Sequence, residues 1–297
     1  MSPTPKVTIG IAFLNPGEHF ALALKSVFAQ TFTDWEMILV DDGSSDGSLT
    51  LARSIKDPRV RVYSDGLNKR LNARLNELVS LARARYFFRM DADDIMHPER
   101  LERQYAELLR SDSETVVGTG ACSIDRNSHI VGVRRPIGKH TGFGANQPFI
   151  HPSVAAPTEW FRRNPYSESF VFHRSQDAEL WCRTAHHSNF VNLPDLLLYY
   201  REIGTFSYEN YIGSQLGLIF LLRKQLGRQR MRYVVVLLWY LAKIFVVSVY
   251  DVLGKENSIV GRRFRPIRPE QRRQAEDGLV RALSCPLPIC PSAEKCG

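Results

Sequence analysis

The sequence predicts an α/β fold with a mostly parallel sheet and helices on both of its faces. Over the first 115 residues, apolar runs of strand length alternate with segments of helical periodicity, and this order leads to right-handed crossovers between parallel strands. Acidic clusters follow two of the predicted strands, at the carboxyl ends where ligands bind in such sheets. Hydrophobic residues make up 44% of the 297 residues, which provides for a sizeable core.

Four strands are predicted in the first half of the chain, because four short runs are apolar. They cover residues 7–13, 36–40, 60–64 and 86–90. The helices between and after them are marked by apolar residues three, four and seven positions apart. These markers run from Phe20 to Phe28, from Leu71 to Ala82 and from Leu101 to Leu109. Residues 44–55 read as a further helix with a Ser or Asp oxygen at its N-cap.

Beyond residue 115 the periodic pattern is looser. Residues 132–149 are rich in Gly and basic residues, which predicts a loop. Residues 175–187 have helical spacing, and residues 190–201 read as a strand.

Basic residues are concentrated at the C-terminal end of the chain. The whole chain carries a formal net charge of +8, and residues 221–297 hold 15 Lys and Arg against 6 Asp and Glu. The rest of the chain is therefore close to neutral. This distribution argues against nucleic acid as a partner and favours a tail that meets an anionic surface.

The most apolar segment of that tail, residues 233–250, contains one charge, Lys243. Its length is near the roughly 20 residues of a membrane span, but a central Lys costs about 2.5–3.5 kcal/mol on insertion. A helix lying in or on the membrane fits this pattern, and a buried helix of a soluble fold fits it equally well. The N-terminal residues lack a signal-peptide pattern. We therefore expect a cytoplasmic protein, peripheral or shallowly inserted at the cytosolic face of the membrane.

Three aspartates, Asp91, Asp93 and Asp94, lie within four residues, directly after an apolar strand. Their charges repel one another, so a compensating positive charge is expected. Hard divalent cations such as Mg²⁺ prefer oxygen ligands and keep substrate phosphates in their shell. A cation site is the preferred interpretation. The alternative is a solvated turn in which Asp94 caps the next helix.

A second acidic pair, Asp41 and Asp42, ends the strand at 36–40. Asp, Gly and Ser are ordinary turn residues, so this stretch is ambiguous by itself. Parallel strands end at the same edge of a sheet, which predicts that this pair and the Asp91 cluster share an edge. A carboxylate at that edge can accept hydrogen bonds from a nucleobase or ribose.

Taken together, these stretches resemble glycosyltransferase family 2. The resemblance rests on VTIGIAFLNPGEHF with LVDDGSSDGS, YFFRMDADDIMHPERLERQ, FIHPSV, SQDAELWCR and LPDLLLYYR, in the family's order. It covers roughly residues 5–205, and only the combination is specific. The resemblance implies a catalytic domain at 1–220, with a nucleotide-binding half at 1–115 and an acceptor half at 116–220. A basic and apolar membrane-associating tail at 221–297 follows it.

The resemblance also implies a nucleotide-sugar-binding glycosyltransferase A-type fold and an inverting reaction. One sugar would move from a nucleoside diphosphate sugar, with a UDP-sugar favoured, to a glycan or lipid-linked acceptor hydroxyl. Cell-surface polysaccharide synthesis is the expected setting. The expected cofactor is Mn²⁺ or Mg²⁺, because a bound cation neutralises the charge that grows on the diphosphate. The expected partners are therefore the donor, the acceptor and an anionic membrane surface.

Site residues carry over from the resemblance one by one. Asp42 would contact the nucleobase, with Asp41 beside it. Asp93 would hold the metal ion, and Asp91 would assist at the ribose or the metal. Asp177 matches the family's catalytic base, which takes the proton of the attacking hydroxyl.

Two further residues are alternatives or helpers at this site. Arg74 is a basic residue that would help to neutralise the diphosphate, and Glu179 is the alternative base. Without the resemblance, Asp177 reads as a carboxylate favoured by the helix N-terminus.

The chain departs from the family pattern at Leu14, Gln176 and Ile203. Leu14 replaces an aromatic ring that would stack on the base, and Gln176 replaces a Glu before the catalytic base. Ile203 stands where the family has a histidine near the metal. The stretch QLGRQ at 225–229 lacks the Trp of processive members, which argues against a processive synthase. Two competing readings stay open: a sugar nucleotidyltransferase, and a non-catalytic nucleotide-binding scaffold subunit.

Overall fold

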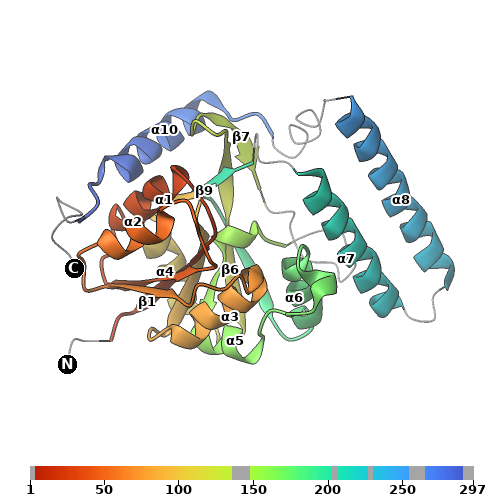
Figure 1. Ribbon diagram of the computed structural model, residues 1–297, viewed down its shortest axis with the longest axis horizontal. Coiled ribbons are helices and arrows are strands. Elements are labelled where there is room, and N and C mark those ends of the chain that lie inside the picture. The colour runs from red at the N-terminus through yellow and green to blue at the C-terminus, as the bar shows by residue number, and fades with distance from the viewer. Residues whose placement is uncertain (1–3, 136–147, 203–206, 227–229, 254–264, 290–297) are drawn as a thin grey trace.

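The computed structural model describes residues 4–135, 148–202, 207–226, 230–253 and 265–289 (Figure 1). Its strands are β1 (Val7–Phe13), β2 (Trp35–Asp41), β3 (Val60–Ser64), β4 (Tyr86–Asp91), β5 (Ile95–Met96), β6 (Thr115–Ile124), β7 (Ile130–Arg134), β8 (Ala155–Pro157) and β9 (Asn189–Arg201). They form a single sheet in the order β3-β2-β1-β4-β8-β6-β9-β5, and β7 pairs with β6. The predicted α/β fold class is confirmed.

The four strands predicted in the first half of the chain form the parallel half of the sheet. β1 pairs in parallel with β2 and β4, and β2 pairs in parallel with β3. At the carboxyl edge, Phe13 lies opposite Asp41, and Ala12 lies opposite Asp91. The register therefore brings both acidic clusters to one edge, as the sequence predicts.

The other half of the sheet is mixed. β8 runs antiparallel to both β4 and β6, while β6 and β9 run parallel. β6 has no counterpart in the sequence prediction, although it is buried over its whole length. Its sequence, TVVGTGACSI, interleaves Gly, Thr and Ser with apolar residues, so it lacks an apolar run. The loop predicted for 132–149 is wrong at its start, because Gly132 to Arg134 belong to β7, and residues 136–147 lie outside the described residues.

Helices cover both faces of the sheet. They are α1 (His19–Phe28), α2 (Ser48–Ser54), α3 (Arg70–Leu81), α4 (Arg100–Arg110), α5 (Thr158–Arg163), α6 (Gln176–Thr184), α7 (Tyr208–Leu226), α8 (Arg230–Val252) and α10 (Pro269–Ser284). Alternate residues of β2 face opposite sides: Met37 and Leu39 join the cluster under α1, α2 and α4, whereas Ile38 and Val40 join the cluster under α3, α5 and α6. Each face therefore has its own core.

The predicted N-cap of α2 needs a small correction. The cap residue is Gly47, whose φ of 85° is in the left-handed region that favours glycine. The preceding Asp46 still contributes, because its Oδ1 accepts the N–H of Ser48 at 3.0 Å.

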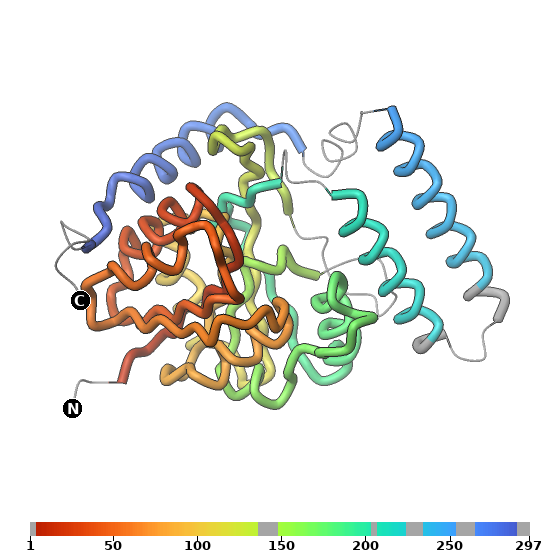
Figure 2. The backbone as a smooth tube through the Cα atoms, in the orientation of Figure 1, coloured from red at the N-terminus to blue at the C-terminus, as the bar shows by residue number. Residues whose placement is uncertain are grey.

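The last described segment of the predicted tail returns to the main body. The backbone tube in Figure 2 shows α10 beside α1, at the opposite side of the molecule from α8. The hydroxyl of Tyr199 donates to the carbonyl of Ala275 at 2.7 Å. A Cβ at Gly278 would lie 2.5 Å from that hydroxyl, so the close approach of α10 requires glycine there. The domain division at residue 220 stays a prediction, and α10 contacts the predicted catalytic part.

Helices α7 and α8 project together from the other side of the molecule (Figure 1). Tyr240 and Val247 of α8 are buried, and the Tyr208 hydroxyl of α7 lies 2.6 Å from Ser248 Oγ. Within the described residues, Val234–Val252 is the one helix long and apolar enough to cross a membrane, and only 11% of it is buried.

Candidate active site

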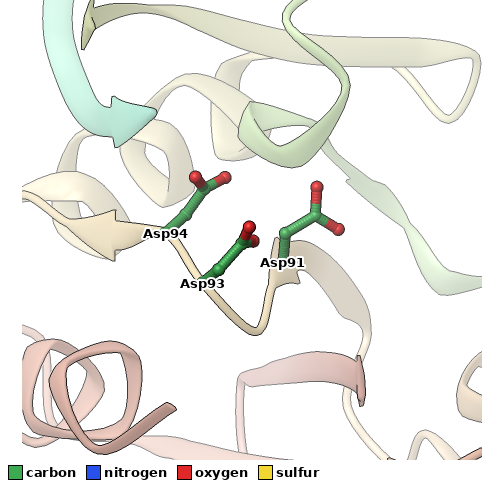
Figure 3. A group of neighbouring side chains, drawn as sticks. All are labelled: Asp91, Asp93 and Asp94. Carbon is green, nitrogen blue, oxygen red and sulfur yellow. The ribbon is translucent and has the colours of Figure 1, made fainter. Parts of the chain in front are cut away.

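The carboxyl groups of Asp91, Asp93 and Asp94 converge where β4 ends and the chain turns into β5 (Figure 3). One oxygen from each lies within 4.8 Å of one oxygen of the others. Hereafter these three residues are called the acidic triad. At this spacing two unit charges repel by about 3 kcal/mol at an effective dielectric constant near 20. The arrangement is therefore costly without a positive charge between or beneath the carboxylates.

Burial adds to this cost at two of the three carboxyl groups. Burial, reinforced by Asp91, raises the pKa of Asp93 to about 6. Burial, followed by the charges of Asp93 and Asp91, raises the pKa of Asp94 well above its usual range. Asp94 Oδ1 accepts the backbone N–H of Arg201 at 2.9 Å, whereas its buried Oδ2 has no hydrogen-bond partner among the described residues. An acceptor without a partner beside two further carboxylates is a feature that fits a bound cation.

Beneath the triad, a fully buried arginine supplies part of the compensating charge. The Nη2 of Arg89 donates to Asp91 Oδ1 at 2.6 Å, and its backbone N–H donates to the carbonyl of Val154. On the other side, the Nε of Arg201 donates to the carbonyl of Asp93 at 2.9 Å. These contacts fix the turn and neutralise only one carboxylate directly. Asp94 Oδ2 and the carboxylate of Asp93 are the oxygens that would hold a hard divalent cation such as Mn²⁺ or Mg²⁺.

Asp41 and Asp42 have different surroundings, although they are neighbours in sequence. Asp41 Oδ1 accepts the N–H of Ser44 at 2.9 Å, and its Oδ2 accepts the hydroxyl of Ser64 at 2.9 Å. Asp41 therefore holds the turn after β2. Asp42 lines a cleft, and its carboxylate accepts the backbone N–H groups of Lys69 and Arg70 at 2.7 and 3.1 Å.

Arg74 is buried behind Asp42. Its Nε donates to Asp42 Oδ1 at 2.9 Å, and its guanidinium also pairs with Asp65 and Glu77 at 2.6 and 2.7 Å. Desolvation opposes the charge of Arg74, but these three carboxylates raise its pKa further above its ordinary value. Its donors are thus committed to neighbouring side chains, and it orients Asp42 from behind. Arg74 is not among the described residues that line the cleft.

The cleft has a volume of about 700 Å³ and opens at the carboxyl end of β1. One wall comes from Ala12, Phe13, Leu14 and the start of α3, and the facing wall comes from the segment before α6, the end of β9 and α7. Helix α7 can approach the segment before α6 closely because residue 217 is glycine. A Cβ at Gly217 would lie 2.1 Å from Ser175 Oγ. A cleft of this volume accommodates a drug-sized or nucleotide-sized ligand.

Asp177 lies in the first turn of α6, directly after Gln176, which lines the cleft. Its Oδ1 accepts the N–H of Ala178 at 2.8 Å. Burial raises the pKa of Tyr166, and the charges of Asp177 and Asp91 act on it in the same direction. The charges of Asp177 and of Asp91, one member of the triad, therefore both act on Tyr166.

The alternative base, Glu179, faces elsewhere. It is buried and pairs with Arg183 Nε at 2.9 Å. This pairing engages the carboxylate of Glu179, whereas Asp177 directly follows the cleft-lining Gln176.

His151 is a buried residue that packs behind the site. Its Nε2 lies 2.9 Å from the hydroxyl of Tyr166. Burial, helped by Arg89, lowers the pKa of His151 well below its usual range. His151 is therefore neutral at pH 7 and holds Tyr166 behind the site.

Comparison with known proteins identifies the family of the chain. The sequence profile described as "Glycosyl transferase family 2" matches residues 8–170. The chain belongs to that family. EpsE of Bacillus subtilis, which is named as a glycosyltransferase, is 33% identical over 192 residues, or 62% of this chain and 68% of that protein. The O-antigen biosynthesis glycosyltransferase WbnJ of Escherichia coli is 28% identical over 207 residues, or 66% of this chain and 79% of that protein.

Two solved structures share the fold. Residues 1–349 of S. aureus TarS, in complex with UDP, superpose with a TM-score of 0.60 at 16% identity, over 93% of this chain and 80% of that chain. The mannosyltransferase PcManGT from Pyrobaculum calidifontis, in complex with GDP-Man and Mn²⁺, superposes with a TM-score of 0.59 at 13% identity, over 95% and 86%. The expected glycosyltransferase A-type fold is confirmed.

Sequence reasoning missed several residues of this family 2 site. Arg89 sits within an apolar strand, and its ion pair with Asp91, two residues later on β4, becomes evident only in the structure. Glu202 lines the cleft and pairs with Arg134 at 2.9 Å. Arg70 and Phe170 also line the cleft. The departure at Ile203 lies outside the described residues.

Proposed function

We propose that the protein is a metal-dependent, inverting glycosyltransferase that moves one sugar from a nucleoside diphosphate sugar to an acceptor hydroxyl. The observation that carries the proposal is the acidic triad, which lies on the same sheet edge as Asp42 and the cleft. Membership of glycosyl transferase family 2 supports the reaction class. The complexes of TarS with UDP and of PcManGT with GDP-Man and Mn²⁺ support a nucleotide-sugar donor and a divalent cation.

In this proposal each residue at the carboxyl edge of the sheet has a separate role. Asp93, assisted by Asp91, holds Mn²⁺ or Mg²⁺, which when bound neutralises charge on the leaving diphosphate. Asp42, fixed from behind by Arg74, accepts hydrogen bonds from the nucleobase, while Asp41 keeps the adjoining turn in place. Asp177 takes the proton from the acceptor hydroxyl as that oxygen attacks. A direct displacement of this kind inverts the configuration at the transferred sugar.

The acceptor is proposed to be a glycan or lipid-linked molecule at a membrane surface. The outer face of α8 exposes large apolar side chains, including Val235, Leu238 and Phe245, each at least 60% exposed. Such a contiguous apolar face marks an interaction site, and the basic composition of residues 221–297 suits an anionic bilayer. Because α7 both contacts α8 and lines the cleft, a membrane on α8 would lie beside the active site. Cell-surface polysaccharide synthesis at the cytosolic face fits this placement. It also fits the similarity to WbnJ, which is named for O-antigen biosynthesis.

The experiment that tests the reaction is release of nucleoside diphosphate from UDP-sugars and GDP-sugars, with Mn²⁺ and with total membranes from the source cells as acceptor. The wild-type protein should release diphosphate from at least one donor. Asp177→Asn should lower this rate about 100-fold or more, because general base catalysis contributes roughly 10²–10⁴-fold. The matched control is Glu270→Gln, an acid in the first turn of α10, which should retain full activity.

Two outcomes would favour the other readings. Release of pyrophosphate from a nucleoside triphosphate and a sugar phosphate would make the protein a sugar nucleotidyltransferase. Full function of Asp177→Asn in cells, with no donor turned over by the wild type, would favour a non-catalytic nucleotide-binding scaffold.

A further inference from the structure

Two arginines line the cleft without a carboxylate partner. Arg70 stands at the start of α3, and Arg174 lies just before α6 on the facing wall. Both are exposed, and within the described residues neither makes an ion pair with a carboxylate. Arg201, a third arginine of the cleft, differs because its guanidinium donates to the carbonyls of Asp93, Asp125 and Arg126.

The acids of the same cleft already have arginine partners. Asp42 pairs with Arg74 at 2.9 Å, and Glu202 pairs with Arg134 at 2.9 Å. Among the described residues that line the cleft, the arginines Arg70, Arg174 and Arg201 outnumber the acids Asp42 and Glu202, so the lining carries a surplus of positive charge. A surplus inside a concave site attracts anionic ligands.

Arg70 is held in a strained backbone conformation. Its φ is +69°, a region that residues with a Cβ rarely adopt and that glycine adopts freely. The conformation lets its backbone N–H donate to Asp42 Oδ2 at 3.1 Å, and a glycine would make that bond without strain. The guanidinium is the feature that glycine would lack, and strain of this kind concentrates at functional sites.

The side chain of Arg70 is also preorganised. Its guanidinium carbon lies 4.8 Å from the centre of the Phe170 ring, and Phe170 in turn stacks on His173 with ring centres 4.8 Å apart. Phe170 is 64% exposed and lines the cleft. An arginine stacked on an aromatic ring keeps its N–H donors free at its edge, where they match the oxygens of a phosphate.

We infer that Arg70 and Arg174 bind the diphosphate of the donor, as a second anchor besides the cation at the acidic triad. This inference rests on the proposed function, because it takes a nucleoside diphosphate sugar as the ligand. The backbone N–H of Arg70 donates to Asp42, which is proposed to contact the nucleobase. The side chain of Arg70 therefore starts next to the proposed nucleotide site. Each arginine supplies a forked donor set of the kind that binds phosphate oxygens.

The test compares Arg70→Gly and Arg70→Ala with the wild type, using calorimetry with UDP, uridine and inorganic pyrophosphate in the presence of Mn²⁺. Both variants should bind UDP and pyrophosphate about tenfold more weakly, the value of one charge-assisted hydrogen bond. Uridine affinity should change less than twofold. The thermal midpoint of Arg70→Gly should equal or exceed that of the wild type, because glycine removes the backbone strain.

Arg85→Ala is the matched control, because Arg85 is also exposed and stacked on a ring, at 5.3 Å from Tyr86, but lies at the opposite end of β4. It should bind all three ligands like the wild type. Unchanged UDP affinity in both Arg70 variants, or an equal loss for UDP and uridine, would overturn the diphosphate assignment. Pyrophosphate binding that depends on Arg70, in a protein that binds no nucleotide, would retain the anion site and reject the proposed function. If the wild type bound neither UDP nor pyrophosphate, both the anion site and the proposed function would be rejected.

Discussion

We expect single residues at this site to lower the stability of the fold in exchange for ligand binding. The acidic triad gathers three carboxylates within 4.8 Å, and Arg89 pairs with one of them. The sequence locates the three aspartates, because they follow an apolar strand as a cluster. It does not locate Arg89 or the left-handed Arg70. The ion pair of Arg89 with Asp91 depends on side-chain geometry at the end of β4, and the role of Arg70 depends on its backbone angle and on partners from other elements. Local sequence patterns carry neither kind of information.

A stability measurement on Asp93→Asn tests this trade in the absence of metal. The pKa of Asp93 is raised from 3.8 to about 6, first by burial and then by Asp91. The folded state therefore holds the proton more tightly than the unfolded state, so the wild type loses stability as pH rises from about 4 through 6. At 1.36 kcal/mol per pKa unit, Asp93→Asn should be more stable than the wild type by about 2–3 kcal/mol at pH 8 and by much less at pH 4.

Denaturant unfolding at the two pH values, with a chelator present, measures this difference. Added Mn²⁺ should then stabilise the wild type and leave Asp93→Asn unchanged, because a ligand stabilises only the state that binds it. A variant that is less stable than the wild type at pH 8 without metal would show that the carboxylate of Asp93 supports the fold by itself.

At the scale of elements, the predicted helices and strands of the first half agree with the structure, and β6 was missed. The agreement has a physical reason: β1, β2 and β4 are buried on both faces, so their apolar runs are continuous. β6 is equally buried, but its Gly118 and Gly120 lie against Phe149 and Leu196, so space for side chains is absent. The side-chain volume at such a contact is supplied by the residue of the neighbouring segment, which the local sequence does not reveal.

Helix α8 supports a prediction about membrane binding. One of its faces packs on α7 through Tyr240 and Val247, and the opposite face exposes Leu238 at 60% and Phe245 at 69%. The double variant Leu238→Glu with Phe245→Glu should lose binding to liposomes that contain anionic lipid, while its far-UV spectrum and thermal midpoint stay unchanged. Each exposed apolar side chain that enters the bilayer contributes on the order of 1–2 kcal/mol, so the loss should exceed 20-fold in co-sedimentation. The control is Val280→Glu, because Val280 is 65% exposed on α10, away from this face. Equal sedimentation of the double variant and the wild type with the liposomes would reject α8 as the membrane contact.

At the scale of the whole molecule, the topology brings residues distant in the chain to one edge. Asp42 follows β2, the acidic triad follows β4, and Asp177 begins α6, which packs against the same sheet. The sequence predicts the meeting of the first two, because parallel strands share an edge. The place of Asp177 came from the family resemblance, because no rule of chain topology sets the position of α6. The closing of the cleft by α7 was not predicted at all, since it depends on the contact at Gly217.

The central claim is that the acidic triad holds a divalent cation against the diphosphate of a nucleotide. Calorimetric titration with UDP, GDP, CDP and TDP, with and without Mn²⁺, on the wild type and on Asp93→Ala tests it most directly. The account predicts that one nucleotide binds the wild type only with Mn²⁺, and that Asp93→Ala loses this binding while it remains folded. Metal-independent binding that survives in Asp93→Ala, or no nucleotide binding by the folded wild type, would contradict it.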